Sequence, residues 1–352
     1  MSAAALRSTA LYDKALGCLA GAALGDAAGA AAKGAGCGCG CGSGAGSGEQ
    51  VGGQGSHDVL AFGAPGDETA MVEIVARMLI DTGGGAMLDD WARAMCDHSP
   101  QFAKDGAFFI SVQQVFSAVG RRRYPPRYTG LGTMPHSTGV VAMGPVGIVN
   151  ACNPWQAALQ AYELATLMHV YDVGFCQDGA AAVAAAVAAA CRTDATVASV
   201  LDAAVDVILP VSGAEMADLI RQARQLASDT GDFDRFRAEV CENGDRWLRT
   251  LPVDPRETVP VALAIFSLTG GDVQQAITCA VRFGRAADAI GCIAGTMSGA
   301  FSGAGSISPD WQAKLQDHRG KHETLATGLA AAARTKLQAL RAAAATLRSI
   351  AP

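Results

Sequence analysis

Apolar residues recur at helical spacing through most of the chain, and few stretches alternate with a period of two. One such run carries Met71, Ile74, Val75, Met78 and Leu79, and another carries Ile290, Ile293, Ala294, Met297 and Phe301. The pattern predicts helices over residues 11–32, 68–81, 88–96, 106–118, 155–169, 180–191, 196–208, 214–227, 234–248, 258–268, 273–281, 288–301 and 324–351. We therefore expect an all-α protein, with its chemistry on loops and at helix N-termini.

The same pattern predicts one domain with an insert. No linker divides the chain after residue 56, so a single domain is expected over residues 11–350. Residues 34–56 are rich in Gly, Ala and Ser, and ordering so many glycines costs much conformational entropy. This stretch is interpreted as a flexible insert, and residues 1–10 as a flexible N-terminus.

Composition excludes several classes of protein. Half of the 352 residues are hydrophobic, which is enough for a large core, and only 17% are charged, with a net charge of −6. Such a chain offers no basic surface for nucleic acid. The triplet Arg121, Arg122 and Arg123 is a local exception, and its simpler interpretation is a solvated loop or helix end.

No membrane span is expected, because the longest apolar stretches are interrupted or bounded by charged residues such as Asp26, Lys33 and Arg192. The start of the chain lacks the apolar region of a secretion signal, although it is compatible with a short transit peptide. The 11 cysteines are scattered, as reduced core thiols are. A cytoplasmic protein is therefore expected.

Cys37, Cys39 and Cys41 alternate with glycine inside the predicted insert. Alternating thiols can surround a soft metal ion, but structural zinc sites space their cysteines two to four residues apart and need a second ligand pair. A flexible low-complexity segment is therefore the favoured interpretation, and a thiol metal site the alternative.

Two acidic clusters stand at the starts of predicted apolar helices. Asp67 and Glu68 open one helix, and Asp288 opens another more than 200 residues later. If the fold brings them together, their carboxylates could hold a hard cation such as Mg²⁺. The alternative is that each acid only complements a helix dipole, for about 0.3–1 kcal/mol.

Five blocks in order resemble the ADP-ribosylglycohydrolase family along nearly the whole chain. They are Gly17–Gly29, Gly66–Met71, Met143–Gly147, Gly179–Ala181 after His169, and Gly284–Ile290 followed by Ala294–Ala300. The resemblance implies an all-α orthogonal bundle whose central cleft holds two magnesium ions. It also implies hydrolysis of a glycosidic bond to ADP-ribose, with an ADP-ribosylated protein or a small ribosyl nucleotide as the partner.

The chain departs from that family at both metal motifs. The first motif, Thr/Ser-Asp-Asp-Thr, becomes Gly66, Asp67, Glu68 and Thr69 and loses a hydroxyl. The second, Asp-x-Asp-Thr/Ser, runs from Ala286 to Ala289 and keeps only Asp288 of its ligands. Because Mg²⁺ readily keeps waters, we expect one ion, rather than two, on Asp67, Glu68 and Asp288, with Asp67 or Glu68 activating the water.

Substrate-binding residues are predicted on three other segments. His136, Ser137, Thr138 and Gly139 form a polar stretch suited to offering backbone N–H groups to phosphate. His169 matches a family region that lines the cleft, although a histidine satisfied between helices is the commoner case. Arg285 adjoins the reduced metal motif, where a cation could replace a missing ion or bind a phosphate.

The sequence leaves two functions open. The first is a magnesium-dependent hydrolase of an ADP-ribosyl or related ribosyl glycoside. The second is a non-catalytic relative that binds a nucleotide sugar or a protein partner, which the missing ligands favour.

Overall fold

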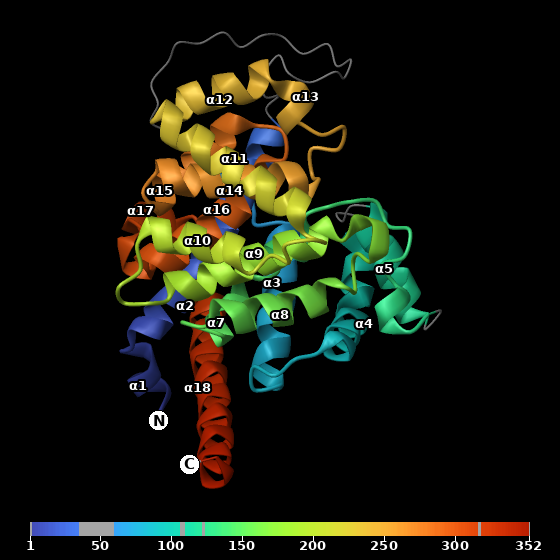
Figure 1. Ribbon diagram of the computed structural model, residues 1–352, viewed down its shortest axis with the longest axis vertical. Coiled ribbons are helices and arrows are strands. Elements are labelled where there is room, and N and C mark those ends of the chain that lie inside the picture. Colours follow the sequence, from blue (N-terminus) through green and yellow to red (C-terminus); the bar gives the residue numbers. More distant parts are fainter. Residues whose placement is uncertain (1, 35–59, 106–109, 122–123, 316–317, 352) are drawn as a thin grey trace.

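The computed structural model describes residues 2–34, 60–105, 110–121, 124–315 and 318–351 (Figure 1). These residues form helices and turns without a strand, which confirms the predicted all-α class. Apart from residue 34, the predicted insert over residues 34–56 lies outside the described residues. So do Cys37, Cys39 and Cys41.

Eighteen α-helices follow one another along the described chain. The first nine are α1 (Ala3–Arg7), α2 (Ala10–Gly34), α3 (Asp67–Asp81), α4 (Leu88–Asp105), α5 (Ile110–Gly120), α6 (Thr138–Val141), α7 (Gly144–Val149), α8 (Pro154–Ala165) and α9 (Phe175–Ala190). The others are α10 (Val197–Asp206), α11 (Ala214–Thr230), α12 (Phe233–Glu242), α13 (Gly244–Trp247), α14 (Pro255–Leu268), α15 (Val273–Phe283), α16 (Ala287–Ser302), α17 (Pro309–Ala313) and α18 (His318–Ile350).

The structure adds to and adjusts the expected elements in several places. Within the N-terminal segment, Ala3–Arg7 form α1, whose Leu6 is buried. The helix predicted over 234–248 is interrupted at Asn243 and forms α12 and α13. The polar stretch at residues 136–139 is a loop only at its start, because α6 begins at Thr138.

Helices α2 and α16 pack against each other through six glycines, which we call the glycine seam. Its members face one another antiparallel in three pairs: Gly17 with Gly299, Gly21 with Gly295, and Gly25 with Gly291. A Cβ atom on any of them would lie only 1.9–2.7 Å from a backbone atom of the opposite helix. Only residues without a side chain allow the two backbones to approach this closely.

Lys14 fixes the end of the seam. Its Nζ atom donates hydrogen bonds to the carbonyl oxygens of Ala300, at 3.1 Å, and Phe301, at 3.0 Å, near the C-terminus of α16. It also donates to Ala190 O, at 2.8 Å, at the end of α9. A cation therefore satisfies the free carbonyl groups of two helix ends at once.

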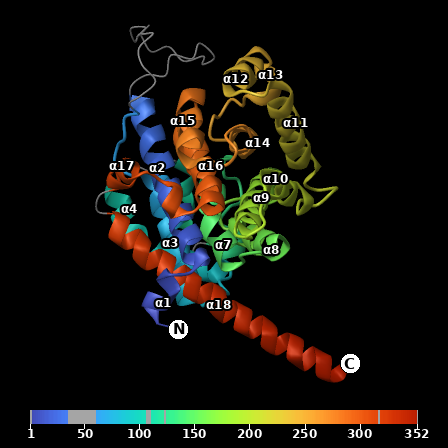
Figure 2. The ribbon, with the colours of Figure 1, turned by 90° about the vertical axis from the view of Figure 1, so that its left-hand side faces the viewer.

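Helix α18 runs across the body of the protein and then projects beyond it (Figure 2). Its first half buries residues such as Leu325 and Leu329, whereas every described residue after Lys336 is exposed. Helix α9 is buried along nearly its whole length.

One segment, Ala10–Ala32, is long and apolar enough to cross a membrane by length and composition. Of its most apolar stretch, 78% is buried inside the protein, where it packs against α16.

We expect Gly25→Ala to lower the free energy of unfolding by about 3 kcal/mol or more, because the new methyl group would overlap the backbone of α16. Urea unfolding checks this. Gly320→Ala is the matched control: Gly320 lies within α18 with no atom in the way of a Cβ, so this change should stabilise by up to about 1 kcal/mol. Equal effects of the two substitutions would contradict a close seam.

Asp178 is a buried acid in the first turn of α9 that also lines a cavity of about 230 Å³ with Tyr162 and Glu163. Burial raises the pKa of Asp178 from 3.8 to about 6. A raised carboxyl pKa means that the folded state holds the proton more tightly than the unfolded state does. Stability from this group is therefore full below pH 3.8 and is lost as the pH rises through about 6.

Asp178→Asn should therefore stabilise the protein above pH 6 by about 1–2 kcal/mol, allowing for solvent screening at the cavity edge, and change little below pH 4. Thermal unfolding of both proteins across this pH range is the measurement. A stabilisation of the same size at every pH would rule out the carboxyl charge as the cause.

Candidate functional site

The start of α3 is held by a side chain from α2. The N-cap residue of α3, Gly66, has no side chain that could accept a hydrogen bond, and the carboxylate of Asp26 on α2 supplies the capping acceptor instead. Asp26 Oδ2 accepts hydrogen bonds from Gly66 N at 2.7 Å, Thr69 N at 3.0 Å and Thr69 Oγ1 at 2.6 Å. This contact fixes Asp67 and Glu68, which lie between the bonded residues. Glu68 is buried and Asp67 is half-buried.

The start of α16 lies against the same part of α2. The backbone of Asp288 fills the place where Gly29 would carry a Cβ atom, at 2.2 Å from it. Gly29 is one helical turn beyond Asp26, so the seam sets Asp288 beside the start of α3. The Asp288 side chain is buried and its Oδ1 accepts a hydrogen bond from Ala289 N at 2.8 Å.

The electrostatics show that these acids share one region. Burial raises the pKa of Asp26, and the charge of Asp288 raises it further. The hydrogen bonds from Thr69 and Gly66 act in the opposite direction and lower it. Burial also raises the pKa of the Cys292 thiol, and Asp26, Glu68 and Asp288 all act in the same direction. The fold therefore brings the predicted acidic clusters together. We call Asp26, Asp67, Glu68 and Asp288 the carboxylate group.

This donor set suits a hard divalent cation. All of its side-chain donors are carboxylate oxygens, which Mg²⁺ prefers, and a cation would relieve the repulsion between buried negative charges. Residues Asp67, Glu68 and Asp288 remain the predicted ligands. Asp26 is different, because it already accepts three hydrogen bonds from the start of α3 and so positions the ligands.

The start of α14 gathers predicted substrate-binding residues from distant segments. Ser137 Oγ donates to Val253 O at 2.7 Å and lies 2.7 Å from Thr258 Oγ1. Asp254, the N-cap of α14, lies close enough to His169 for its charge to act on the imidazole. Thr138 and Gly139, also predicted, are buried in α6.

Arg285 reaches the same helix start. Its guanidinium forms an ion pair with the fully buried Glu257 and donates from Nη2 to Glu257 Oε2 at 2.9 Å and to Arg249 O at 2.6 Å. Burial raises the pKa of Glu257, although Arg285 and the Arg249 backbone N–H oppose the shift. The strained backbone of Arg285, with φ at +56°, is consistent with a conformation that these contacts fix.

The two predicted histidines pack together inside the protein. The rings of His136 and His169 are 4.3 Å apart, and His136 N donates to His169 Nε2 at 3.4 Å. Burial lowers the pKa of His136 well below its usual value, and burial lowers the pKa of His169 to about 4. Both imidazoles are therefore neutral at physiological pH and cannot neutralise a phosphate by charge.

The sequence interpretation assigned no site role to Asp26 or Asp254, and it did not identify Glu257 as the partner of Arg285. Local sequence signals for a helix start existed at two of these positions. Asp254 followed by Pro255 is typical of an N-cap residue followed by proline at the first helical position, and Glu257 is an acid in the first turn. Nothing local shows that Asp26 caps a helix 40 residues away, because that contact depends on the packing of α2 beside α3.

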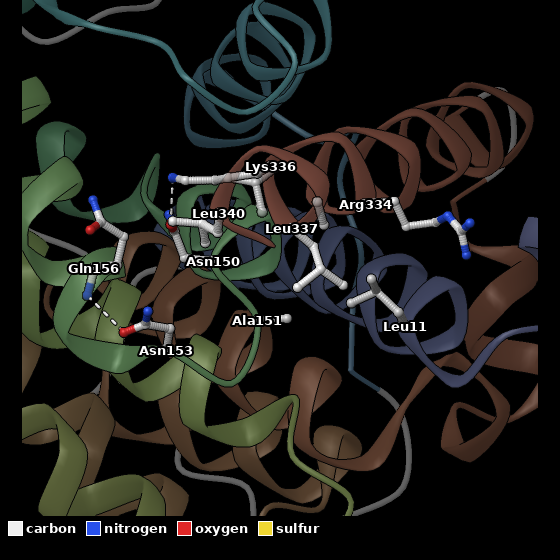
Figure 3. Close-up of a pocket in the computed structure, with 11 residues that line it drawn as sticks. Leu11, Asn150, Ala151, Asn153, Gln156, Arg334, Lys336, Leu337 and Leu340 are labelled. Carbon is white, nitrogen blue, oxygen red and sulfur yellow. Dashed lines mark hydrogen bonds between the residues drawn. The ribbon is translucent and has the colours of Figure 1, made fainter. Parts of the chain in front are cut away.

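Several cavities lie away from these residues. One, of about 160 Å³, is lined by Asn150 of the turn after α7 and by Lys336 and Leu340 of α18 (Figure 3). Lys336 Nζ donates to Asn150 Oδ1 at 2.5 Å there. No member of the carboxylate group lines this cavity.

Comparison with known proteins places the chain in the ADP-ribosylglycohydrolase family. The family model described as ADP-ribosylglycohydrolase matches residues 7–341. A solved structure titled "ADP-ribosylglycohydrolase-related protein complex" has a TM-score of 0.62 at 21% identity, covering 92% of this chain and 99% of that one. This likeness shows the same fold. No curated protein sequence matches the chain.

Asp26→Ala should lower the free energy of unfolding by about 3 kcal/mol, because it leaves two backbone N–H groups and a hydroxyl without their acceptor. Thr69→Val removes only one of these bonds and should cost about 1 kcal/mol. Hydrogen exchange should show faster exchange of the amide of Thr69 in the Asp26 variant. Unchanged protection at the start of α3 would show that Asp26 does not cap this helix.

Proposed function

Because the chain belongs to the ADP-ribosylglycohydrolase family, we propose that it hydrolyses a glycosidic bond between ADP-ribose, or a related ribosyl nucleotide, and its aglycone. The observation that carries this proposal is the carboxylate group. Acids from helix starts more than 200 residues apart share one partly buried region, where the charges of Asp26, Glu68 and Asp288 all act on Cys292.

The chemistry asked of this group is the activation of water. Hydrolysis forms a bond from the water oxygen to the anomeric carbon and breaks the bond to the leaving group, which takes up a proton. Asp67 or Glu68 would accept the proton that the water loses. Asp67 is half-buried, and so it is the more accessible of the two.

The proposal includes one magnesium ion, held by Asp67, Glu68 and Asp288. Such an ion supplies Lewis acidity and lowers the pKa of a bound water. Two ions are not proposed, because Ala286 and Ala289 occupy positions where the resemblance implies ligands, and both are buried, at 1% and 0% exposure.

Substrate contacts are proposed on the segments around the start of α14. Arg285 carries the charge that a diphosphate needs, and it would exchange part of its contact with Glu257 for the phosphate. His136 and His169, being neutral, would contribute hydrogen bonds or ring contacts. Ser137, Thr138 and Gly139 would offer polar groups from the start of α6. The proposed partner is an ADP-ribosylated protein or a small ribosyl nucleotide, in the cytoplasm.

The alternative is a relative that binds a nucleotide sugar without cleaving it. The buried alanines of the second motif favour this function, because they remove ligands rather than rearrange them. Binding and hydrolysis are separable by experiment.

Release of ADP-ribose from modified arginine, modified serine and a small nucleotide substrate, with and without magnesium, tests the proposal. Asp288→Ala and Glu68→Gln should each lower the rate by about 100-fold or more. Asp310→Ala is the matched control, because Asp310 is also a first-turn acid, of α17, but is exposed. If the acids only complement helix dipoles, the three variants should all retain activity.

Calorimetry with ADP-ribose separates the two functions. Binding without release of ADP-ribose from any substrate would establish the non-catalytic alternative. Release that continues after magnesium is removed by a chelator would overturn the role given to the metal.

A further inference from the structure

A second group of ligating side chains joins α3 to α18. Glu73 lies on α3, and His318 and His322 lie one turn apart at the start of α18. Glu73 Oε1 is 3.1 Å from His318 Nδ1 and 3.1 Å from His322 Nε2. One donor atom from each residue lies within 4.8 Å of the other two. Two nitrogens from one helix and an oxygen from another therefore point at a common place.

We propose that Glu73, His318 and His322 bind a zinc ion that ties α18 to α3. Zinc favours imidazole and carboxylate ligands at about 2.0–2.2 Å in a tetrahedron, in which neighbouring ligand atoms are about 3.3 Å apart. The two oxygen-to-nitrogen separations of 3.1 Å are close to that value, and the two nitrogens, which lie within 4.8 Å of each other, would close on the ion by side-chain movement. Histidines at i and i+4 occupy one helix face, as in helical zinc sites.

The surroundings of Glu73 support this assignment. The ammonium of Lys321 forms an ion pair with the other oxygen, Oε2, which leaves Oε1 for the metal and orients the carboxylate. His322 is buried at 1% exposure, whereas the His318 side chain is 31% exposed. The partly exposed side of His318 offers access for the ion, and a water from that side would complete four ligands.

This site differs from the carboxylate group in place and in chemistry. Glu73 follows Glu68 by five residues on α3, which puts them about 140° apart around the helix. Two imidazole nitrogens favour zinc over magnesium, whereas an all-oxygen donor set favours magnesium. Zinc binding here is therefore independent of the proposed hydrolysis.

Zinc titration of the full chain tests the site, with Cys37, Cys39 and Cys41 replaced by serine so that their thiols do not compete. One zinc ion per chain is expected, and excess magnesium should not displace it. His318→Ala and His322→Ala should each weaken zinc binding by about 10–100-fold or more. Loss of a residue that only orients a metal ligand already costs about 10–100-fold in affinity, and loss of a ligand should cost at least as much. His98→Ala, at a histidine outside the group, should leave the affinity unchanged.

Further variants separate a zinc site from a buried ion-pair cluster. Zinc should raise the thermal unfolding temperature of the parent protein and not that of His318→Ala, whose partly exposed side chain makes it the variant least prone to misfold. Lys321→Met should lower stability but keep stoichiometric zinc binding. Asp288→Ala should also keep it, because Asp288 belongs to the other group.

Three results would overturn the proposal. They are the absence of stoichiometric zinc, zinc binding that both histidine substitutions leave unchanged, and loss of the zinc in Asp288→Ala. Cobalt provides a direct check of geometry, because a tetrahedral site gives Co²⁺ an intense visible absorption band that His318→Ala should remove.

Discussion

The close contact between α2 and α16 is the constraint on which the rest of this structure depends. At the glycine seam the two backbones touch without intervening side chains, and residues beside it on both helices, such as Ala22 and Ala294, are buried. It fixes both the separation and the register of the two helices, since each glycine faces one glycine of the other helix. Because Gly25 faces Gly291 and Gly29 faces Asp288, this register brings Asp288 close enough to Asp26 for its charge to act on that carboxyl group.

The seam also explains how several acids come to share a buried region. Asp26 accepts three hydrogen bonds from the start of α3, which stabilise its carboxylate and compensate for burial. The backbone of Asp288 packs against Gly29 of α2, and its Oδ1 accepts a hydrogen bond from Ala289 N. The repulsion between these groups is the property that makes the region suited to a cation. Without a bound cation, the same repulsion between carboxylates lowers the stability of the fold.

Helix α3 connects the two candidate sites. Its first turn carries Asp67 and Glu68, and Glu73 on another face meets α18. Helix α18 packs along the body only over its first half, so the contacts that its His318, Lys321 and His322 make with Glu73 of α3 lie near its anchored end. A metal ion at that place would stabilise the position of α3, and through it the start of the helix that holds the carboxylate group.

The sequence by itself determined the helical class, most helix bounds and the family resemblance, because periodicity and ordered motifs are local or follow the chain. It also identified Asp67, Glu68 and Asp288 as acids that a fold could bring together. Short α6 and α7 were not predicted, because helices of four to six residues show too little periodicity. The capping role of Asp26, the Glu257 partner of Arg285, and the meeting of Glu73 with His318 and His322 were decided only by tertiary structure. Each joins segments far apart along the chain, and their proximity follows from helix packing, which no local pattern encodes.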